Sequence, residues 1–123
     1  MDRVELTILR NLIYDEEYIR KVIPFIQPDY FENAQEKVIF EEIAKFIVKY
    51  DKPASQEVLS IEIEKRSDIN DSQFKEIVEL VSSLDRQVVN FEWLIDTTEK
   101  WCKDRAIYLA LMKSIKIADD QDE

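Results

Sequence analysis

The chain has 123 residues, of which 46% are apolar and 36% are charged, a composition typical of one globular domain with its own core. It contains no glycine and no histidine, which excludes glycine-rich phosphate loops, two-residue β-hairpins and catalytic or zinc sites that depend on histidine. Its 27 acidic and 17 basic residues give a formal net charge of −10, so non-specific DNA binding is disfavoured.

The single cysteine and the hydropathy of the chain bear on where the protein resides. Cys102 has no second cysteine with which to pair, and it follows Trp101 in a helical pattern, so we expect a small buried hydrophobe rather than a reactive thiol. We find neither a signal peptide nor an uninterrupted apolar run of about 18 residues. These features predict a cytoplasmic protein without a membrane span.

The first third of the chain predicts two helices and a connection. Apolar residues at helical spacing indicate a helix over 4–13, with Asp2 available as its cap, and a second helix from Asp15 to Pro24. The connection over 24–32 is too apolar for a solvated loop, so we expect it to pack on the core. Its apolar residues are Phe25, Ile26, Tyr30 and Phe31.

Three further helices complete the predicted head. Asn33 and Glu36 form a capping-box pattern before a central helix that runs to Tyr50. Residues 56–66, with Ser55 as cap, alternate with a period of two as a strand would, but no second strand is available, and we predict a helix. Asn70 and Gln73 form another capping box before an apolar stripe that ends at Leu84.

The last predicted helix is unusual in its second half. Asn90 can cap a helix that runs to about Ala118, near 40 Å in length, which is more than the head needs to span its core. Up to Cys102 the helix is amphipathic, but from Ala106 onward apolar residues lie all round its axis. We therefore predict a head over 1–105 and a projecting arm over 106–123, whose cover should come from another subunit or from sequence beyond Glu123. The predicted partner interface consists of Ile107, Tyr108, Leu111, Met112 and Ile115.

Other side chains are assigned structural functions. We expect Trp93 and Trp101 to pack in the core rather than to anchor an interface. The carboxylate pairs Glu41–Glu42 and Glu76–Glu79 and the acidic run 119–123 are interpreted as solvated helix faces rather than metal ligands. Contact with single-stranded DNA stays open for a basic cluster of Lys103, Arg105, Lys113 and Lys116.

Several segments, taken in order, resemble one known family. These are residues 8–15 (ILRNLIYD), residues 28–31 (PDYF), the helix over 38–46, and the run from Trp93-Leu94 through Thr98-Glu99-Lys100 to Arg105-Ala106. Together they resemble the N-terminal domain of DnaB-like replicative DNA helicases, most closely the bacteriophage T4 type. Bacterial members usually have small residues where this chain has Arg10 and Asn11, which favours the phage branch.

The resemblance implies an all-α head followed by a helical hairpin. In the family, hairpins of neighbouring subunits pair, six heads form a collar above ATP-driven motors, and primase docks on the collar. Residues 106–118 would be the first arm of the hairpin, and the second arm, linker and motor would follow Glu123. The motor would use ATP and Mg²⁺, whereas this chain would bind no cofactor and catalyse nothing by itself.

Three functional hypotheses follow. The first is an assembly and primase-docking module of a hexameric replicative helicase, whose partners are neighbouring subunits and a primase or loader, without DNA contact by the head. The second is a self-contained helical adaptor, or a phage inhibitor, that captures one host protein by helix-in-groove contact. The third is a carboxylate metalloenzyme, which the composition disfavours.

Overall fold

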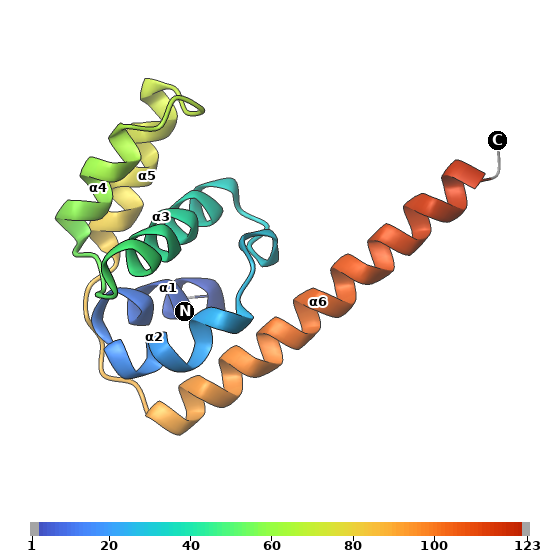
Figure 1. Cartoon of the computed structure of the whole chain (residues 1–123), viewed down its shortest axis with the longest axis horizontal. Coiled ribbons are helices and arrows are strands. Elements are labelled where there is room, and N and C mark those ends of the chain that lie inside the picture. Colours follow the sequence, from blue (N-terminus) through green and yellow to red (C-terminus); the bar gives the residue numbers. More distant parts are fainter. Residues whose placement is uncertain (1–2, 122–123) are drawn as a thin grey trace.

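The computed structural model describes residues 3–121, and within that range it contains helices and no strand. Helices α1 to α5 form a head, and α6 lies along one side of α1 and α2 before it extends past them (Figure 1). This arrangement confirms the predicted all-α head followed by a long helix. The elements are α1 (Val4–Tyr14), α2 (Glu16–Val22), η1 (Ile23–Phe25), η2 (Pro28–Tyr30), α3 (Ala34–Tyr50), α4 (Gln56–Glu64), α5 (Asp71–Ser83) and α6 (Phe91–Gln121), where η marks a 3-10 helix.

Side-chain caps fix the starts of several helices at the predicted residues. The Asp15 carboxylate accepts a hydrogen bond from the Tyr18 amide at 3.0 Å, and the Ser55 hydroxyl accepts from the Val58 amide at 3.1 Å. The predicted capping box of α5 has both of its bonds. Helix α1 begins after Arg3, which makes no side-chain cap bond, and the predicted cap Asp2 lies outside the described residues.

The start of α3 departs from the prediction. Asn33 accepts hydrogen bonds from the amides of Gln35 and Glu36, as a cap should. The Glu36 carboxylate, however, does not complete a capping box, because it forms an ion pair with Arg3 inside the head. A long-range cationic partner has replaced the local backbone amide.

The segment with alternating hydrophobicity is helical, as predicted, but α4 ends at Glu64, two residues earlier than expected. Leu59 and Ile63, four residues apart, are buried, whereas Ile61 is about half exposed. Of the three alternating apolar residues, only the first and the third face the core. Their separation of four residues is the spacing of one helix face.

The connection between α2 and α3 packs on the core only in part. Ile26 and Phe31 are buried, and the Phe31 ring stacks on Phe40 with centroids 5.2 Å apart. Phe25 is 68% exposed, so the expectation that all four apolar residues pack inward is wrong at this position. The tight 3-10 turn that includes Pro24 directs Phe25 and Ile26 to different sides of the chain.

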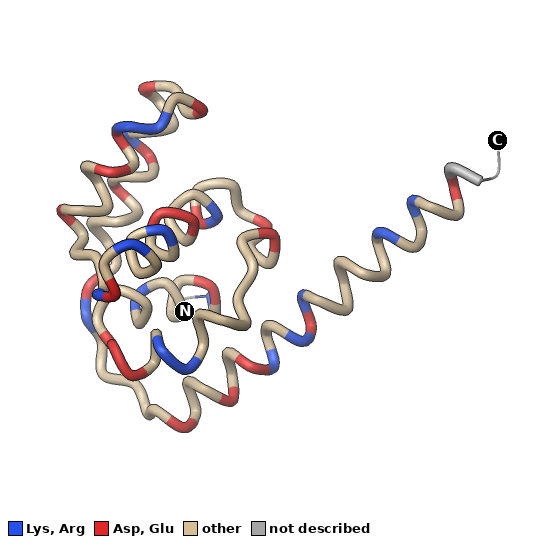
Figure 2. Tube along the Cα trace, viewed as in Figure 1, with Lys and Arg blue, Asp and Glu red and all other residues tan. Residues whose placement is uncertain are grey.

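An ion cluster fastens the α4–α5 pair to α3. The Arg66 guanidinium pairs with Glu42 at 3.1 Å, Glu41 at 3.3 Å and Asp68 at 2.7 Å. The Glu42 side chain is buried, so the interpretation of Glu41–Glu42 as a solvated face is wrong for Glu42. Its charge is tolerated in the interior because Arg66 reaches it from 24 residues away. Elsewhere on the head, charges of both signs are distributed over the helices (Figure 2).

Candidate partner interface

The first half of α6 is anchored to the head by buried contacts. Leu94, Thr98 and Cys102 are buried on one face of the helix. The Thr98 hydroxyl donates to the Leu94 carbonyl and lies 2.7 Å from the Tyr18 hydroxyl, from which it can accept. Burial raises the pKa of the Cys102 thiol to about 11, so it stays protonated at neutral pH. The prediction of a small buried hydrophobe at this position is confirmed.

The two tryptophans occupy different environments. Trp101 is buried against Tyr30 and Phe31, with ring centroids 5.9 Å and 4.9 Å away. Trp93 is about half exposed, so the expectation of core packing is wrong for this residue. Eight residues at 100° each leave the two side chains about 80° apart around the helix, and only Trp101 faces the head.

Arg105 makes the last polar contacts between α6 and the head. Its Nε donates to the Tyr30 carbonyl at 2.6 Å, and its guanidinium lies 3.4 Å from Glu32 and 4.8 Å from the centroid of the Tyr108 ring. Lys103 pairs with Glu99 one turn earlier, at 2.9 Å. Two of the four cations in the basic cluster are thus engaged within the chain, and contact of that cluster with single-stranded DNA stays an open prediction.

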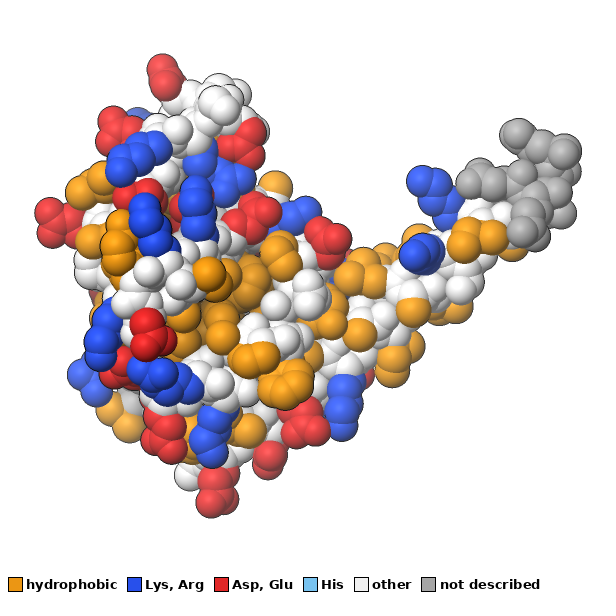
Figure 3. Space-filling model, in the orientation of Figure 1, with side chains coloured by type: hydrophobic (Ala, Val, Ile, Leu, Met, Phe, Trp, Pro, Cys, Tyr) orange, Lys and Arg blue, Asp and Glu red, His pale blue; other side chains and the backbone are white. Residues whose placement is uncertain are grey.

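Beyond Ala106 the helix leaves the head, and most of its large apolar side chains up to Ile117 are exposed. The five predicted interface residues, Ile107, Tyr108, Leu111, Met112 and Ile115, are between 43% and 67% exposed. Figure 3 shows hydrophobic side chains along this projecting part of the molecule. The structure therefore places all five on the projecting helix and leaves them accessible, and their contact with a partner stays a prediction.

The exposed residues are arranged around the helix in a way that suits a protein partner. Tyr108, Leu111, Met112 and Ile115 follow the i, i+3, i+4, i+7 spacing of a helix that lies against a groove or another helix. Ile107 extends the apolar surface around the axis. Full burial of such a side chain stabilises a complex by about 1.5 to 3 kcal/mol. A partner that buries these side chains would therefore gain substantial free energy of association.

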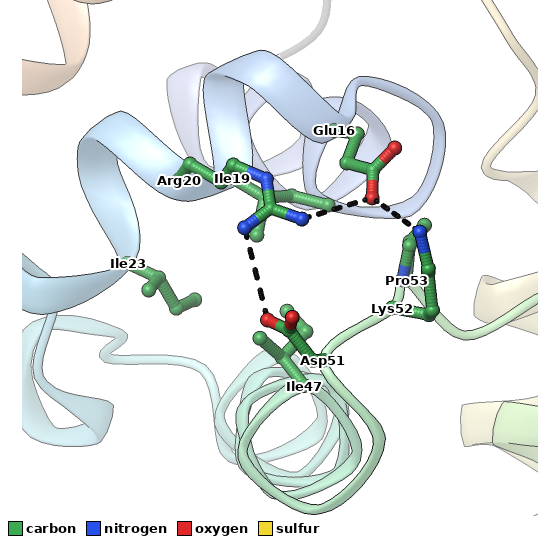
Figure 4. A pocket seen from close by; sticks show the side chains of 8 residues that line it. All are labelled: Glu16, Ile19, Arg20, Ile23, Ile47, Asp51, Lys52 and Pro53. Atoms are coloured by element: carbon green, nitrogen blue, oxygen red, sulfur yellow. Dashed lines mark hydrogen bonds and ion pairs between the residues drawn. The ribbon is translucent and has the colours of Figure 1, made fainter.

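A small pocket between α2 and the end of α3 has a charged rim (Figure 4). Arg20 spans it, pairing with Glu16 at 3.2 Å and with Asp51 at 3.7 Å, and Lys52 also reaches Glu16. The hydrogen bond from Arg20 lowers the pKa of the Glu16 carboxyl, which therefore stays ionised. The charges on the rim pair with one another across the pocket. This arrangement favours a structural contact between α2 and the end of α3 over acid–base chemistry.

A larger and mostly apolar groove of about 510 Å³ lies between the α2–η1–η2 segment and α6. Its lining combines Phe25 and Tyr30 with Ile95 and Ala106 of α6. Sequence reasoning missed this groove because its two walls are about 70 residues apart. The exposed Phe25 next to Pro24 was the one local signal that could have indicated it.

Two searches of the described residues gave negative results. Among them, no cluster of three or more cysteine, aspartate or glutamate side chains could hold a metal ion. No helix formed by those residues is both long enough and apolar enough to cross a bilayer.

The comparison with known families agrees with the helical order of the head. Residues 2–96 match the family described as DnaB-like helicase N terminal domain. The chain belongs to this family. The matched region contains α1 to α5 and the first residues of α6, and it stops before the exposed end of that helix. The resemblance drawn from the four sequence segments is thereby confirmed.

A curated relative supports the same assignment. The chain is 31% identical over 110 residues to a DnaB-like replicative helicase of Enterobacteria phage T4. The aligned region covers 89% of this chain and 23% of that protein. The chain thus corresponds to less than a quarter of the relative's length, so the family assignment describes an N-terminal module of a replicative helicase.

Proposed function

We propose that this chain is the assembly and primase-docking module of a hexameric replicative helicase and that it supplies no chemistry by itself. The observation that carries the proposal is the exposed apolar end of α6, which projects from a head that is otherwise well packed. Membership of the DnaB-like family supports a helicase context. ATP and Mg²⁺ would then serve a motor domain elsewhere in the helicase.

Self-association through the end of α6 can be tested on the 123-residue chain. We expect the wild type to form dimers or larger species as its concentration rises, and Leu111→Asp with Ile115→Asp to remain monomeric, because burying a carboxylate without a partner is costly. Sedimentation equilibrium over a wide concentration range measures this difference. Val48→Asp with Ile61→Asp, which changes two exposed aliphatic residues of the head, is the matched control and should associate like the wild type.

Two outcomes would contradict the assembly proposal. One is a longer chain with both arms of the hairpin that stays monomeric at every concentration while its α6 remains helical by circular dichroism. The other is a double variant in α6 that associates as strongly as the wild type.

Docking of primase is the second part of the proposal. The acidic head, with little available positive charge, suits a protein partner better than a nucleic acid. We expect the primase of the same replication system to bind the chain in isothermal titration calorimetry, and single-stranded DNA to give no heat of binding. Tight DNA binding without primase binding would refute this part.

A second candidate function is a small adaptor or inhibitor that captures one host protein. The anchor spacing from Tyr108 to Ile115 favours it, because one helix face can enter a groove of a foreign protein. The adaptor hypothesis predicts a chain that is monomeric alone and that binds a host replication protein through Tyr108 and Met112. The assembly hypothesis predicts association of the chain with itself.

A further inference from the structure

The groove between the α2–η1–η2 segment and α6 is preformed, because polar contacts hold its two walls together. The Tyr18 hydroxyl lies 2.7 Å from the Thr98 hydroxyl, and the Nε of Arg105 donates to the Tyr30 carbonyl at 2.6 Å. These contacts connect α6 to α2 and to η2, which are the two ends of the opposite wall. An occupant would therefore lose little free energy in ordering the groove.

The lining of the groove is mostly apolar and extends along several turns of α6. Val22 and Cys102 line it as buried side chains, whereas Phe25 is 68% exposed. Ile95 and Ala106, which both line the α6 wall, are eleven residues apart, or about 16 Å along the helix axis. A helix of about three turns has this length. Covering the exposed apolar surface with the apolar face of such a helix would stabilise a complex.

The charged side chains that line the groove are two lysines and one glutamate. Glu99 pairs with Lys103 at 2.9 Å on the α6 wall. Lys21, on the α2 wall, is exposed and lies 5.6 Å from the centroid of the Phe91 ring, and it forms no ion pair with any residue of the described range. The lining therefore has one positive charge in excess. A carboxylate of a partner can pair with Lys21, whereas a basic partner would be repelled by it.

The excess positive charge is local, because the whole chain has a net charge of −10. At physiological ionic strength charges interact over about 8 Å, so the lysines of the lining affect an occupant of the groove more strongly than distant acidic residues do. A nucleic acid would place many phosphates against an acidic head and would leave most of the apolar lining uncovered. A helix with one apolar face and a few flanking carboxylates matches both the lining and its charge.

We propose that the groove binds an amphipathic helix of a partner protein, with acidic residues on both sides of its apolar face. The apolar face lies against Phe25 and Ile95. The flanking carboxylates lie next to Lys21 and Lys103. The groove ends at Ala106 and contains none of the five residues of the predicted interface. The inference is therefore independent of self-association through the end of α6.

A designed helical peptide of about four turns is the probe for this surface. The acidic version has leucines at i, i+3, i+4 and i+7 and glutamates on both flanks, and the basic version has lysines in place of the glutamates. We expect the acidic version to bind in fluorescence anisotropy and to shift the amide resonances of residues 21–30 and 95–106 in NMR spectra. Phe25→Glu should weaken binding at least about tenfold. Val48→Glu, at an exposed site of α3, is the matched control and should bind like the wild type.

Charge reversal tests the specificity while the apolar lining stays unchanged. Lys21→Glu with Lys103→Glu should bind the basic peptide in preference to the acidic one, a reversal that a folding defect cannot produce. Lys45→Glu with Lys49→Glu, at two exposed lysines of α3, is the matched control and should keep the preference of the wild type. All four positions are exposed, so the thermal unfolding midpoints of both variants should stay close to that of the wild type.

Several outcomes would overturn the inference. These are a wild type that binds neither peptide or binds both equally well, and a Phe25→Glu variant that binds the acidic peptide like the wild type. Binding of a thymidine oligonucleotide that the double lysine variant loses would mean that the groove recognises phosphates instead.

A longer chain with both arms of the hairpin completes the test. It should bind the acidic peptide as the 123-residue chain does, and loss of binding would mean that the second arm covers the groove and that the inference is wrong. The proposed assembly function stands or fails separately, because its test changes Leu111 and Ile115, which do not line the groove.

Discussion

The two halves of α6 differ in burial although they form one continuous helix. From Phe91 to Arg105 the helix presents Leu94, Thr98 and Trp101 to the head, and these side chains are buried. From Ala106 onward the helix is at least as apolar, yet most of its large apolar side chains are exposed. Exposure in the second half thus results from the head ending and not from polar composition. An apolar helix surface that the head leaves open indicates a contact with a further segment or with another molecule.

The sharpest test of this contrast is the same substitution in both halves. Leu94→Ala should destabilise the chain by about 2 to 5 kcal/mol, because it removes buried methyl groups and leaves a cavity. Leu111→Ala should change the stability of the monomer by less than about 0.5 kcal/mol. Urea unfolding at a concentration where the chain is monomeric measures both. Equal effects would mean that the head covers Leu111 in solution.

Ion pairs provide a second contrast between buried and exposed contacts. Arg66→Ala should cost about 3 kcal/mol, because it leaves the buried Glu42 carboxylate without its cation. Lys100→Ala removes an exposed pair with Asp104 on α6 and should cost less than about 0.5 kcal/mol. Chemical denaturation of the two variants gives the comparison. A similarly small loss for Arg66→Ala would show that Glu42 is solvated when unpaired.

The smallest expected effect is a pH dependence that arises in the head at Glu36. Burial raises the pKa of this carboxyl, and the ion pair with Arg3 opposes the shift only in part. A carboxyl whose folded pKa exceeds its unfolded value binds a proton more readily in the folded state, so its contribution to stability grows as the pH falls from neutral through the raised pKa. Relative to Glu36→Gln, the wild type should gain thermal stability between pH 7 and pH 5.

Comparison with Glu36→Gln cancels the titration of all other groups. A wild type that loses stability relative to that variant on acidification would mean that the ion pair with Arg3 outweighs burial. Leu111→Asp with Ile115→Asp should show the same pH dependence as the wild type at this site, because the exposed end of α6 does not contact Glu36.

Local sequence signals predicted much of the fold. The capping box of Asn70 and Gln73, the caps Asp15 and Ser55, and the break at Pro24 placed helix boundaries to within two residues, because they act through hydrogen bonds and steric contacts between near neighbours. The prediction of a helix for α4 was also confirmed, although its apolar residues alternate as in a strand. The five residues of the predicted interface were chosen from the excess of apolar residues around one helix axis, and their contact with a partner stays a prediction.

The sequence by itself determined the all-α class, the order and approximate limits of the helices, and the presence of an apolar helical segment that the head does not cover. Only the tertiary structure decided that Glu42 is buried with Arg66, that Phe25 and Trp93 face outward, and that α2, η1 and α6 together form a groove. Caps and periodicity depend on residues within about one helical turn. The Arg66–Glu42 ion pair and the Tyr18–Thr98 hydrogen bond instead join residues 24 and 80 positions apart, and the packing of whole helices determines which of them meet.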